Sequence, residues 1–277
     1  MGLRIATNIA SQNVQKNLKE VSNAGNSSLE KLSSGKRITK ASDDAAGLAI
    51  ATNLEAQTKG LRQASRNAND GVSLVQTAEG GLNETSNILI RLRELTIQAA
   101  SDTVGDQERG FLDKEYQQLS KEIDRISEST VFNGTQLLNG KGKGAMDFQV
   151  GAFSGEQNRI TFDSSESDSS ASSIGIASTN IANKDDALSS IGSIDKAIEK
   201  VSGQRANLGS IQSRLQSTIK NLEVQTINQD SARSVIQDVD VAEATAALSS
   251  NQVVKNAAVS TLAQANGIPN SALRLIG

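Results

Sequence analysis

The sequence predicts a mainly α-helical protein: a long antiparallel coiled-coil rod made from both ends of the chain, with a small β-hairpin region inserted in its middle. Three observations predict this fold. Hydrophobic residues repeat at helical spacing in both halves of the chain, the repeat breaks between residues 131 and 178, and all six aromatic residues lie between positions 111 and 162. The rest of the 277-residue chain has no aromatic side chain to anchor a thick core. Its helices are therefore expected to bury narrow faces against partners.

Each end of the chain is predicted to form a long, thin amphipathic helix. Residues 1–42 hold seven basic and two acidic residues. The candidate assembly residues of this end are Ile5, Ile9, Leu18, Val21, Leu29 and Leu32. The matching residues near the other end are Val239, Ala242, Ala246, Val253, Ala257 and Leu262. Such helices are marginal alone in water, so we expect the two ends to pair with each other and then with copies of the chain. Residues 1–42 and 235–277 would form an inner domain, and residues 43–234 a rod.

The rod is predicted from two hydrophobic seams and a third helix. The seam in the second half consists of Ile191, Ile194, Ile198, Val201, Leu208, Leu215, Ile219 and Leu222. The seam in the first half consists of Leu61, Ala68, Val72, Val75, Leu82, Ile88, Leu92, Leu95 and Ala99. The third helix is expected over about Asp106 to Ser129. Ser42 is predicted to cap the start of the rod, and Gly80-Gly81 and residues 101–105 are predicted to interrupt helices.

Between residues 131 and 178 the period of the pattern changes. Asn133-Gly134 and Asn139-Gly140 are dipeptides that accept the positive φ of tight turns. Phe148 and Val150 alternate with polar residues, as do Ile160 and Phe162, which predicts a β-hairpin. The run SSESDSSASS, residues 164–173, is typical of a low-complexity loop.

The composition argues against an enzyme. The chain has no Cys and no His, which removes cysteine nucleophiles, disulfides, the commonest general base and nearly all zinc chemistry. The glycine-rich run that ends at Lys141 lacks the spacing of a phosphate-binding loop. Asp43-Asp44 and the pair Asp238 and Asp240 are better explained by helix-start electrostatics than by a metal. We therefore predict no catalytic residue, no cofactor and no metal, and a net charge of −3 predicts no nucleic-acid partner.

No membrane-spanning or targeting segment is predicted. The first 20 residues lack an apolar stretch typical of a cleaved signal peptide. The longest weakly charged run, Ala244 to Leu273, carries Asn, Gln, Ser and Thr throughout, which would be costly in lipid. We interpret it as a helix buried in a protein–protein interface.

Several long segments resemble one family. They are LSSGKRITKASDDAAGLAIA (32–51), RNANDGVSLVQTAEGGLNE (66–84), RLRELTIQAAS (91–101), EIDRI followed by FNGTQLLNG, and NAAVSTLAQAN (256–266). These segments resemble bacterial flagellin, in a short form without large outer domains. The resemblance implies a structural subunit that polymerises into the helical flagellar filament used for swimming, is exported unfolded without a cleaved signal peptide, and is assembled outside the cell at the filament tip. The implied partners are other copies of the chain, the flagellar cap and hook-junction proteins, and the export chaperone and export apparatus.

The resemblance also suggests two conditional sites. Flagellins detected by Toll-like receptor 5 present three residues that match Arg91, Leu95 and Glu115 here. The alternative for Leu95 is the core, because it belongs to the first seam. A candidate O-glycosylation region, for which a plain solvated loop is the alternative, comprises Ser164, Ser165, Ser167, Ser169, Ser170, Ser172 and Ser173.

Three other functions compete with the filament subunit. A hook–filament junction protein would share the terminal helices but would not form long filaments. A secreted coiled-coil translocator would bind membranes, and the sequence has neither a basic amphipathic face nor an apolar span. An enzyme that uses carboxylates alone would need a pocket signature that the sequence does not carry.

Overall fold

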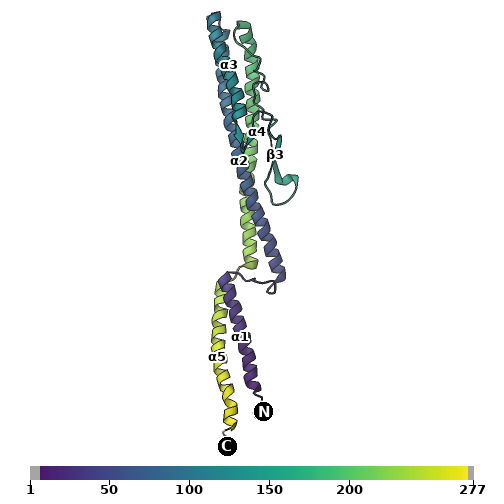
Figure 1. Ribbon diagram of the computed structural model, residues 1–277, viewed down its shortest axis with the longest axis vertical. Coiled ribbons are helices and arrows are strands. Elements are labelled where there is room, and N and C mark those ends of the chain that lie inside the picture. Colours follow the sequence, from purple (N-terminus) through teal and green to yellow (C-terminus); the bar gives the residue numbers. More distant parts are fainter. Residues whose placement is uncertain (1–6, 274–277) are drawn as a thin grey trace. The chain divides into compact units, whose positions relative to one another are not determined.

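The computed structural model describes the backbone of residues 7–273 and the side chains of residues 7–267. It confirms the predicted mainly α-helical fold with a small β region (Figure 1). The helices are α1 (Ile9–Ser34), α2 (Ala45–Ala100), α3 (Asp106–Ser129), α4 (Lys184–Gln237) and α5 (Val241–Leu273). The strands are β1 (Val131–Phe132), β2 (Thr135–Gln136), β3 (Ala145–Gln149) and β4 (Arg159–Asp163), with one 3-10 turn, η1 (Glu156–Asn158).

The chain divides into two compact units. Unit 1 comprises Met1–Ala56 and Asn228–Gly277, and unit 2 comprises Gln57–Ile227. Both divisions fall inside a long helix, one in α2 and one in α4. The predicted division into an inner domain (residues 1–42 and 235–277) and a rod (residues 43–234) refers to the assembled filament and stays a prediction.

Unit 2 is a helical rod with a continuous hydrophobic core. Figure 1 shows α2 and α4 side by side, with α3 beside them and the β region on one flank. The antiparallel register of α2 and α4 is marked by an ion pair of Arg93 with Asp195 at 2.7 Å and one of Arg205 with Glu79 at 3.9 Å. The predicted seams are confirmed. Their buried members include Leu61, Ala68, Val75, Leu82, Leu92, Leu95, Ala99, Ile194, Val201, Leu208, Leu215 and Leu222.

The prediction that Gly80-Gly81 would interrupt a helix is wrong, because α2 runs through both residues. The glycines have different surroundings. A Cβ added at Gly81 would lie 2.6 Å from Leu138 Cδ1 and 2.7 Å from Thr130 Oγ1, whereas a Cβ at Gly80 would meet nothing within 4 Å. Gly81 is therefore a position where the segment after α3 approaches the backbone of α2 closely, a role that sequence alone does not distinguish from a helix break.

The turn at residues 101–105 ends α2 as predicted, and a buried arginine closes it. Arg109 is only 8% exposed. Its guanidinium donates to the carbonyl oxygens of Ala99 at 2.9 Å and Ser101 at 3.0 Å, and to Asp106 Oδ1 at 2.8 Å. The last carbonyls of a helix have no partner within the helix, so Arg109 supplies charged donors where α2 stops.

The predicted cap at the start of α2 is shifted by two residues. Asp44, not Ser42, caps the helix, because its Oδ1 accepts a hydrogen bond of 2.8 Å from the backbone N–H of Gly47. Asp43 instead accepts from the backbone N–H groups of Thr39 and Lys40, each at 3.1 Å. These hydrogen bonds hold the pKa of Asp43 below its usual value.

The predicted β-hairpin is confirmed. Strands β3 and β4 pair antiparallel, with Phe148 opposite Ile160 and Met146 opposite Phe162. Phe162 is fully buried, so the hairpin adds its aromatic face to the core of unit 2. The predicted turn at Asn133-Gly134 joins β1 to β2, and both of its residues have positive φ, 46° and 76°.

Candidate self-assembly surface

Helices α1 and α5 of unit 1 pair in antiparallel fashion, which confirms that the two ends of the chain meet. Asn8 Nδ2 donates to the Ala265 carbonyl oxygen and Ser11 Oγ donates to Asn266 Oδ1, each at 2.8 Å. Midway along the pair, Gly25 faces Asn251, whose Cβ would lie 3.9 Å from a Cβ added at Gly25.

The segments that connect α1 to α2 and α4 to α5 are also joined. The backbone N–H of Arg37 donates to the Gln237 carbonyl oxygen at 2.7 Å, and that of Val239 donates to the Gly35 carbonyl oxygen at 3.1 Å. The Arg37 guanidinium adds a 2.7 Å hydrogen bond to the Ile236 carbonyl oxygen. On the other side of the connection, Asp240 Oδ1 caps α5 by accepting from the backbone N–H of Ala242 at 2.8 Å. These bonds fix the register in which α1 and α5 begin to pair.

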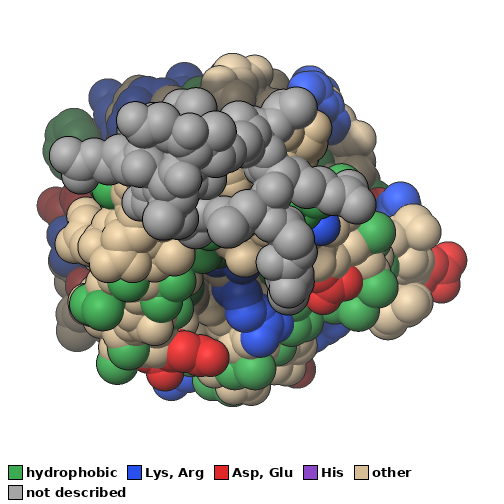
Figure 2. All heavy atoms as spheres, turned by 90° about the horizontal axis from the view of Figure 1, so that it is seen from below, with side chains coloured by type: hydrophobic (Ala, Val, Ile, Leu, Met, Phe, Trp, Pro, Cys, Tyr) green, Lys and Arg blue, Asp and Glu red, His purple; other side chains and the backbone are tan. Residues whose placement is uncertain are grey.

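The α1–α5 pair buries almost none of its hydrophobic side chains. Among the side chains described in these two helices, only those of Ser11 and Ala265 are buried. Large apolar residues of unit 1 are instead exposed: Ile9 50%, Leu29 57%, Ile50 52%, Val235 77%, Val241 60%, Val253 68%, Val254 46% and Val259 50%. Figure 2 shows hydrophobic side chains at the surface among polar ones, in a view from below. A surface of this kind indicates an interaction site.

Most of the predicted assembly residues lie on this surface or at its edge. Ile9, Leu29, Ala242, Ala246, Val253 and Ala257 are exposed, and Leu18, Val21, Leu32, Val239 and Leu262 are half-buried. Ile5 lies outside the described residues. Val241, Val254 and Val259 are also exposed on α5, but they lie outside the apolar repeat that predicts the assembly residues.

The three candidate receptor residues differ in accessibility. Arg91 and Glu115 are exposed and joined by hydrogen bonds of 2.9 and 3.2 Å from Nη2 and Nε to Glu115 Oε1. The bonds to Glu115, followed by that to Glu94, raise the pKa of Arg91 above its usual value. Leu95 is only 1% exposed and belongs to the core of unit 2, as the alternative interpretation held. A partner that binds this face of the chain therefore meets Arg91 and Glu115 but not Leu95.

The serine-rich segment is not the plain solvated loop that its composition suggests. Ser164, Ser167 and Ser169 are buried, whereas Ser165 and Ser172 are exposed and Ser170 and Ser173 are half-buried. The segment is packed on α4, where Gln204 Nε2 donates to the Asp168 carbonyl oxygen at 2.8 Å and Lys200 Nζ donates to that of Ser173 at 2.7 Å. O-glycosylation of this segment stays a prediction, and Ser164, Ser167 and Ser169 are the candidates that are not accessible in the folded chain.

Neither a metal site nor a membrane span is found in the part of the chain that the structure describes. Residues 7–267 contain no group of three or more acidic side chains placed to hold a metal ion. Over the described residues, no helix combines the length and the apolar character needed to cross a bilayer.

Comparison with known families accounts for both ends of the chain. The model of the bacterial flagellin N-terminal helical region matches residues 5–143, and that of the bacterial flagellin C-terminal helical region matches residues 191–276. The flagellin of Halalkalibacterium halodurans is 42% identical over 269 residues, which cover 97% of this chain and 98% of that protein. The flagellin of Bacillus subtilis is 38% identical over 303 residues, which cover 99% of this chain and all of that protein.

Solved structures agree with this relationship. The crystal structure of Bacillus cereus flagellin is 34% identical, with a TM-score of 0.51, and the match covers 57% of this chain and 88% of that chain. A Vibrio parahaemolyticus structure assigned as a flagellar hook-associated protein has a TM-score of 0.58 over 70% of this chain and 99% of that chain, but at 17% identity it shows a likeness of fold alone. Because the two family models together span most of the sequence and the relatives match it over nearly its full length, this chain belongs to the bacterial flagellin family.

Proposed function

We propose that this chain builds the flagellar filament by burying the exposed hydrophobic faces of α1 and α5 against the same helices of neighbouring copies. The chain is a structural subunit of the filament, as its family is. The observation that carries the proposed mechanism is that α1 and α5 are long and paired, yet bury almost no hydrophobic side chain.

Stacking would supply what the α1–α5 pair lacks. Fully burying one Val, Leu or Ile side chain is worth about 1.5–3 kcal/mol relative to exposure. Several exposed side chains of this kind would become buried along each α1–α5 pair when neighbouring copies pack around it. Stabilisation of this kind depends on the concentration of partners. The terminal helices are therefore expected to be loosely ordered in the free subunit and firmly ordered in the filament.

The remaining parts of the proposal follow from the family. The subunit is exported unfolded, guided by an export chaperone and the export apparatus, and is added at the filament tip beneath the cap, outside the cell. The absence of cysteine suits an unfolded export route, because no disulfide forms before assembly. Recognition by Toll-like receptor 5 would use the exposed Arg91 and Glu115, since Leu95 is in the core.

A hook–filament junction protein is the second candidate, favoured by the likeness in fold to the Vibrio structure. The two functions differ in the length of the polymer. A filament subunit elongates without limit from a seed, whereas a junction protein stops after a few copies.

Sedimentation and negative-stain electron microscopy of the seeded full chain test the proposal. We expect long filaments from the full chain and none from a truncation to residues 43–234, which should stay a soluble helical monomer. A matched pair of substitutions locates the effect: Val253→Asp, in α5, should block elongation, and Ile90→Asp, at an exposed residue of α2 in unit 2, should leave it largely intact. Filaments from the truncation, or equal effects of the two substitutions, would contradict the proposed role of α1 and α5.

A further inference from the structure

We infer that a cleft around Arg214 in unit 2 receives the acidic end of unit 2 from a second copy of the chain, so that successive copies stack head to tail. This inference rests on the proposed function and assigns one contact within it. Its three supports are the lining of the cleft, the state of Arg214 and the distribution of charge along unit 2.

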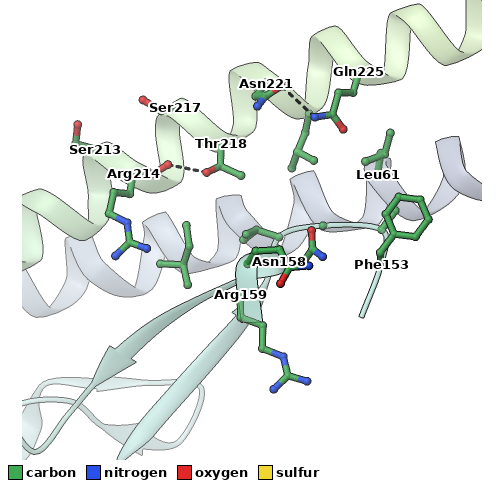
Figure 3. A pocket seen from close by; sticks show the side chains of 16 residues that line it. Leu61, Phe153, Asn158, Arg159, Ser213, Arg214, Ser217, Thr218, Asn221 and Gln225 are labelled. Atoms are coloured by element: carbon green, nitrogen blue, oxygen red, sulfur yellow. Dashed lines mark hydrogen bonds between the residues drawn. The ribbon is translucent and has the colours of Figure 1, made fainter. Parts of the chain in front are cut away.

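The cleft lies between α2, α4 and the turn that joins β3 to β4 (Figure 3). It has a volume of about 490 Å³, large enough for several side chains of a partner. Leu61, Phe153 and Leu222 form its apolar walls. Its polar lining consists of hydroxyl groups, amides and two arginines, and no Asp or Glu contributes to it. The cleft therefore suits a negatively charged partner.

Arg214 is the charged residue of the cleft whose side chain lacks a partner. It is exposed, and it is the one arginine among the described side chains for which neither a hydrogen bond nor an ion pair of its guanidinium is found. The other arginine of the lining, Arg159, is 3.6 Å from Asp147, and Figure 3 shows its side chain pointing away from α4. An unpaired guanidinium beside apolar walls is available to a carboxylate.

The charges of unit 2 are separated along its length. The part near the cleft carries more cations than anions: Lys59, Arg62, Arg66, Arg159, Arg214 and Lys220 against Asp70, Asp147, Glu156 and Glu223. The opposite end, where α2 stops and α3 and α4 begin, carries mostly anions: Asp102, Asp106, Glu108, Asp185 and Asp186 against Arg109 and Lys184. Asp185, in the first turn of α4, is exposed and has no described hydrogen bond or ion pair of its side chain. The acidic end thus offers an unpaired carboxylate to match the unpaired guanidinium.

Within one molecule the two groups cannot meet. Asp185 and Arg214 are 29 residues apart on the same helix (214 minus 185), which corresponds to about 44 Å at the rise of an α-helix. A second copy displaced along the rod brings its acidic end to the cleft of the first. Such a contact uses different surfaces on the two copies, so each copy still offers one free end and the chain of contacts does not close. This is the type of contact that a filament requires.

Cross-linking tests the contact with both charges left in place. The chain has no cysteine, so a double variant Ser213→Cys, Ser189→Cys carries one thiol in the cleft and one a turn beyond Asp185. These positions are about 36 Å apart in one chain (24 residues of helix), too far for a short bis-maleimide to join. Assembled filaments should therefore give a ladder of covalent multimers. The matched control is Ser189→Cys, Ser202→Cys, whose second thiol is exposed midway along α4.

The result separates this inference from the proposed function. Filaments with a ladder from the first variant and little from the control would support head-to-tail stacking. Filaments without a ladder, or with ladders of equal strength from both variants, would overturn the inference while the filament function stands. A wild-type chain that forms no filaments from seeds would overturn the proposed function and the inference with it.

Charge exchange gives a second measurement. We expect Arg214→Glu to raise the critical concentration for assembly on the order of tenfold at low salt, because like charges then face each other. Combining it with Asp185→Arg should restore most of the loss. Lys196→Glu, which makes the same charge change on an exposed site of α4 away from the cleft, should change it little. If Arg214→Glu behaves like Lys196→Glu, the inference is wrong.

Discussion

Units 1 and 2 are both built from long helices of similar composition, yet they bury their side chains to very different extents. In unit 2, Leu82, Leu89 and Leu92 are completely inaccessible to solvent, whereas in unit 1 Leu29 is 57% exposed and Val253 is 68% exposed. The cause is the number of layers. In unit 2 three helices and the β region enclose a common interior, but a pair of helices has a single seam and leaves most of each helix surface in water. Unit 2 can therefore be stable alone, and unit 1 depends on neighbours.

The largest expected difference between the units is in the cost of removing a leucine. Leu215 of α4 is fully buried, and Leu29 of α1 is 57% exposed. Leu215→Ala should lower the free energy of unfolding of the free subunit by about 2–5 kcal/mol, because it leaves a cavity. Leu29→Ala should change it by less than about 0.5 kcal/mol. Urea denaturation followed by circular dichroism measures both. Equal losses would show that unit 1 is already packed in the monomer.

A pair of adjacent glycines sharpens the description of unit 2. Gly81→Ala should lower its stability by about 1–3 kcal/mol through overpacking, because the new methyl group would lie 2.6 Å from Leu138 Cδ1. Gly80→Ala should raise stability by about 0.5–1 kcal/mol, since nothing lies within 4 Å and alanine favours the helix. Thermal unfolding of the two variants side by side tests this. A loss of stability in Gly80→Ala as large as that in Gly81→Ala would mean that α2 is strained at both positions.

The glycine pair also marks the limit of what the sequence predicts. The helices, the seams, the hairpin and the pairing of the two ends follow from the spacing of apolar residues, which is a local property. Whether Gly81 breaks a helix or admits Leu138 depends on a contact between residues 57 positions apart (138 minus 81). The burial of Ser164 and Ser169 has the same origin, because the partners that hold this loop are distant in the sequence. Gln204 on α4 donates to the loop, and the loop donates to carbonyl oxygens in the segment between β2 and β3. Composition alone suggested a solvated loop.

The assembly surface also shows what the sequence does not predict. Periodicity identified Ile9, Leu29 and Val253 as apolar positions of the terminal helices, and they are exposed in the subunit. It could not tell which apolar residues face the partner helix within the chain and which face outward, since a narrow two-helix seam uses only part of a helical repeat. Arg91 and Leu95 illustrate this for the rod: they are neighbours in the motif, but one is on the surface and the other is in the core.

A smaller effect concerns the single tyrosine of the chain. Tyr116 is fully buried and its phenol oxygen lies 2.6 Å from Thr179 Oγ1, so Tyr116→Phe should cost about 1 kcal/mol at neutral pH. Burial, partly offset by that hydrogen bond, raises the pKa of Tyr116 above its usual 10.0. Because the folded state then holds the proton more tightly than the unfolded chain, the contribution of Tyr116 to stability is present below pH 10 and is lost as the pH rises from 10 through the folded pKa.

Tyrosinate absorbance measures this directly, because the chain has one Tyr and no Trp. We expect the phenol to ionise above pH 10, together with the unfolding of unit 2, and the stability of Tyr116→Phe to fall less steeply over the same range. Ionisation at pH 10 with the helices of unit 2 intact would show that Tyr116 is open to solvent.

The smallest expected effect comes from replacing a helical glycine by alanine in each unit. Gly25 in α1 and Gly203 in α4 are both inside helices, and an added methyl group would meet nothing closer than 3.9 Å at the first and nothing within 4 Å at the second. Either substitution to Ala should favour the helix by about 0.5–1 kcal/mol.

In unit 2 the helix is already held by its core, so Gly203→Ala should raise the midpoint of unfolding without changing the helix content. In unit 1 the helix lacks a core, so Gly25→Ala should raise the helix content of the free subunit and leave the midpoint of unit 2 unchanged. Circular dichroism at low temperature and during urea denaturation distinguishes the two readouts. A rise in helix content from Gly203→Ala, or none from Gly25→Ala, would break the contrast, because the terminal helices would then be as well ordered in the free subunit as the rod.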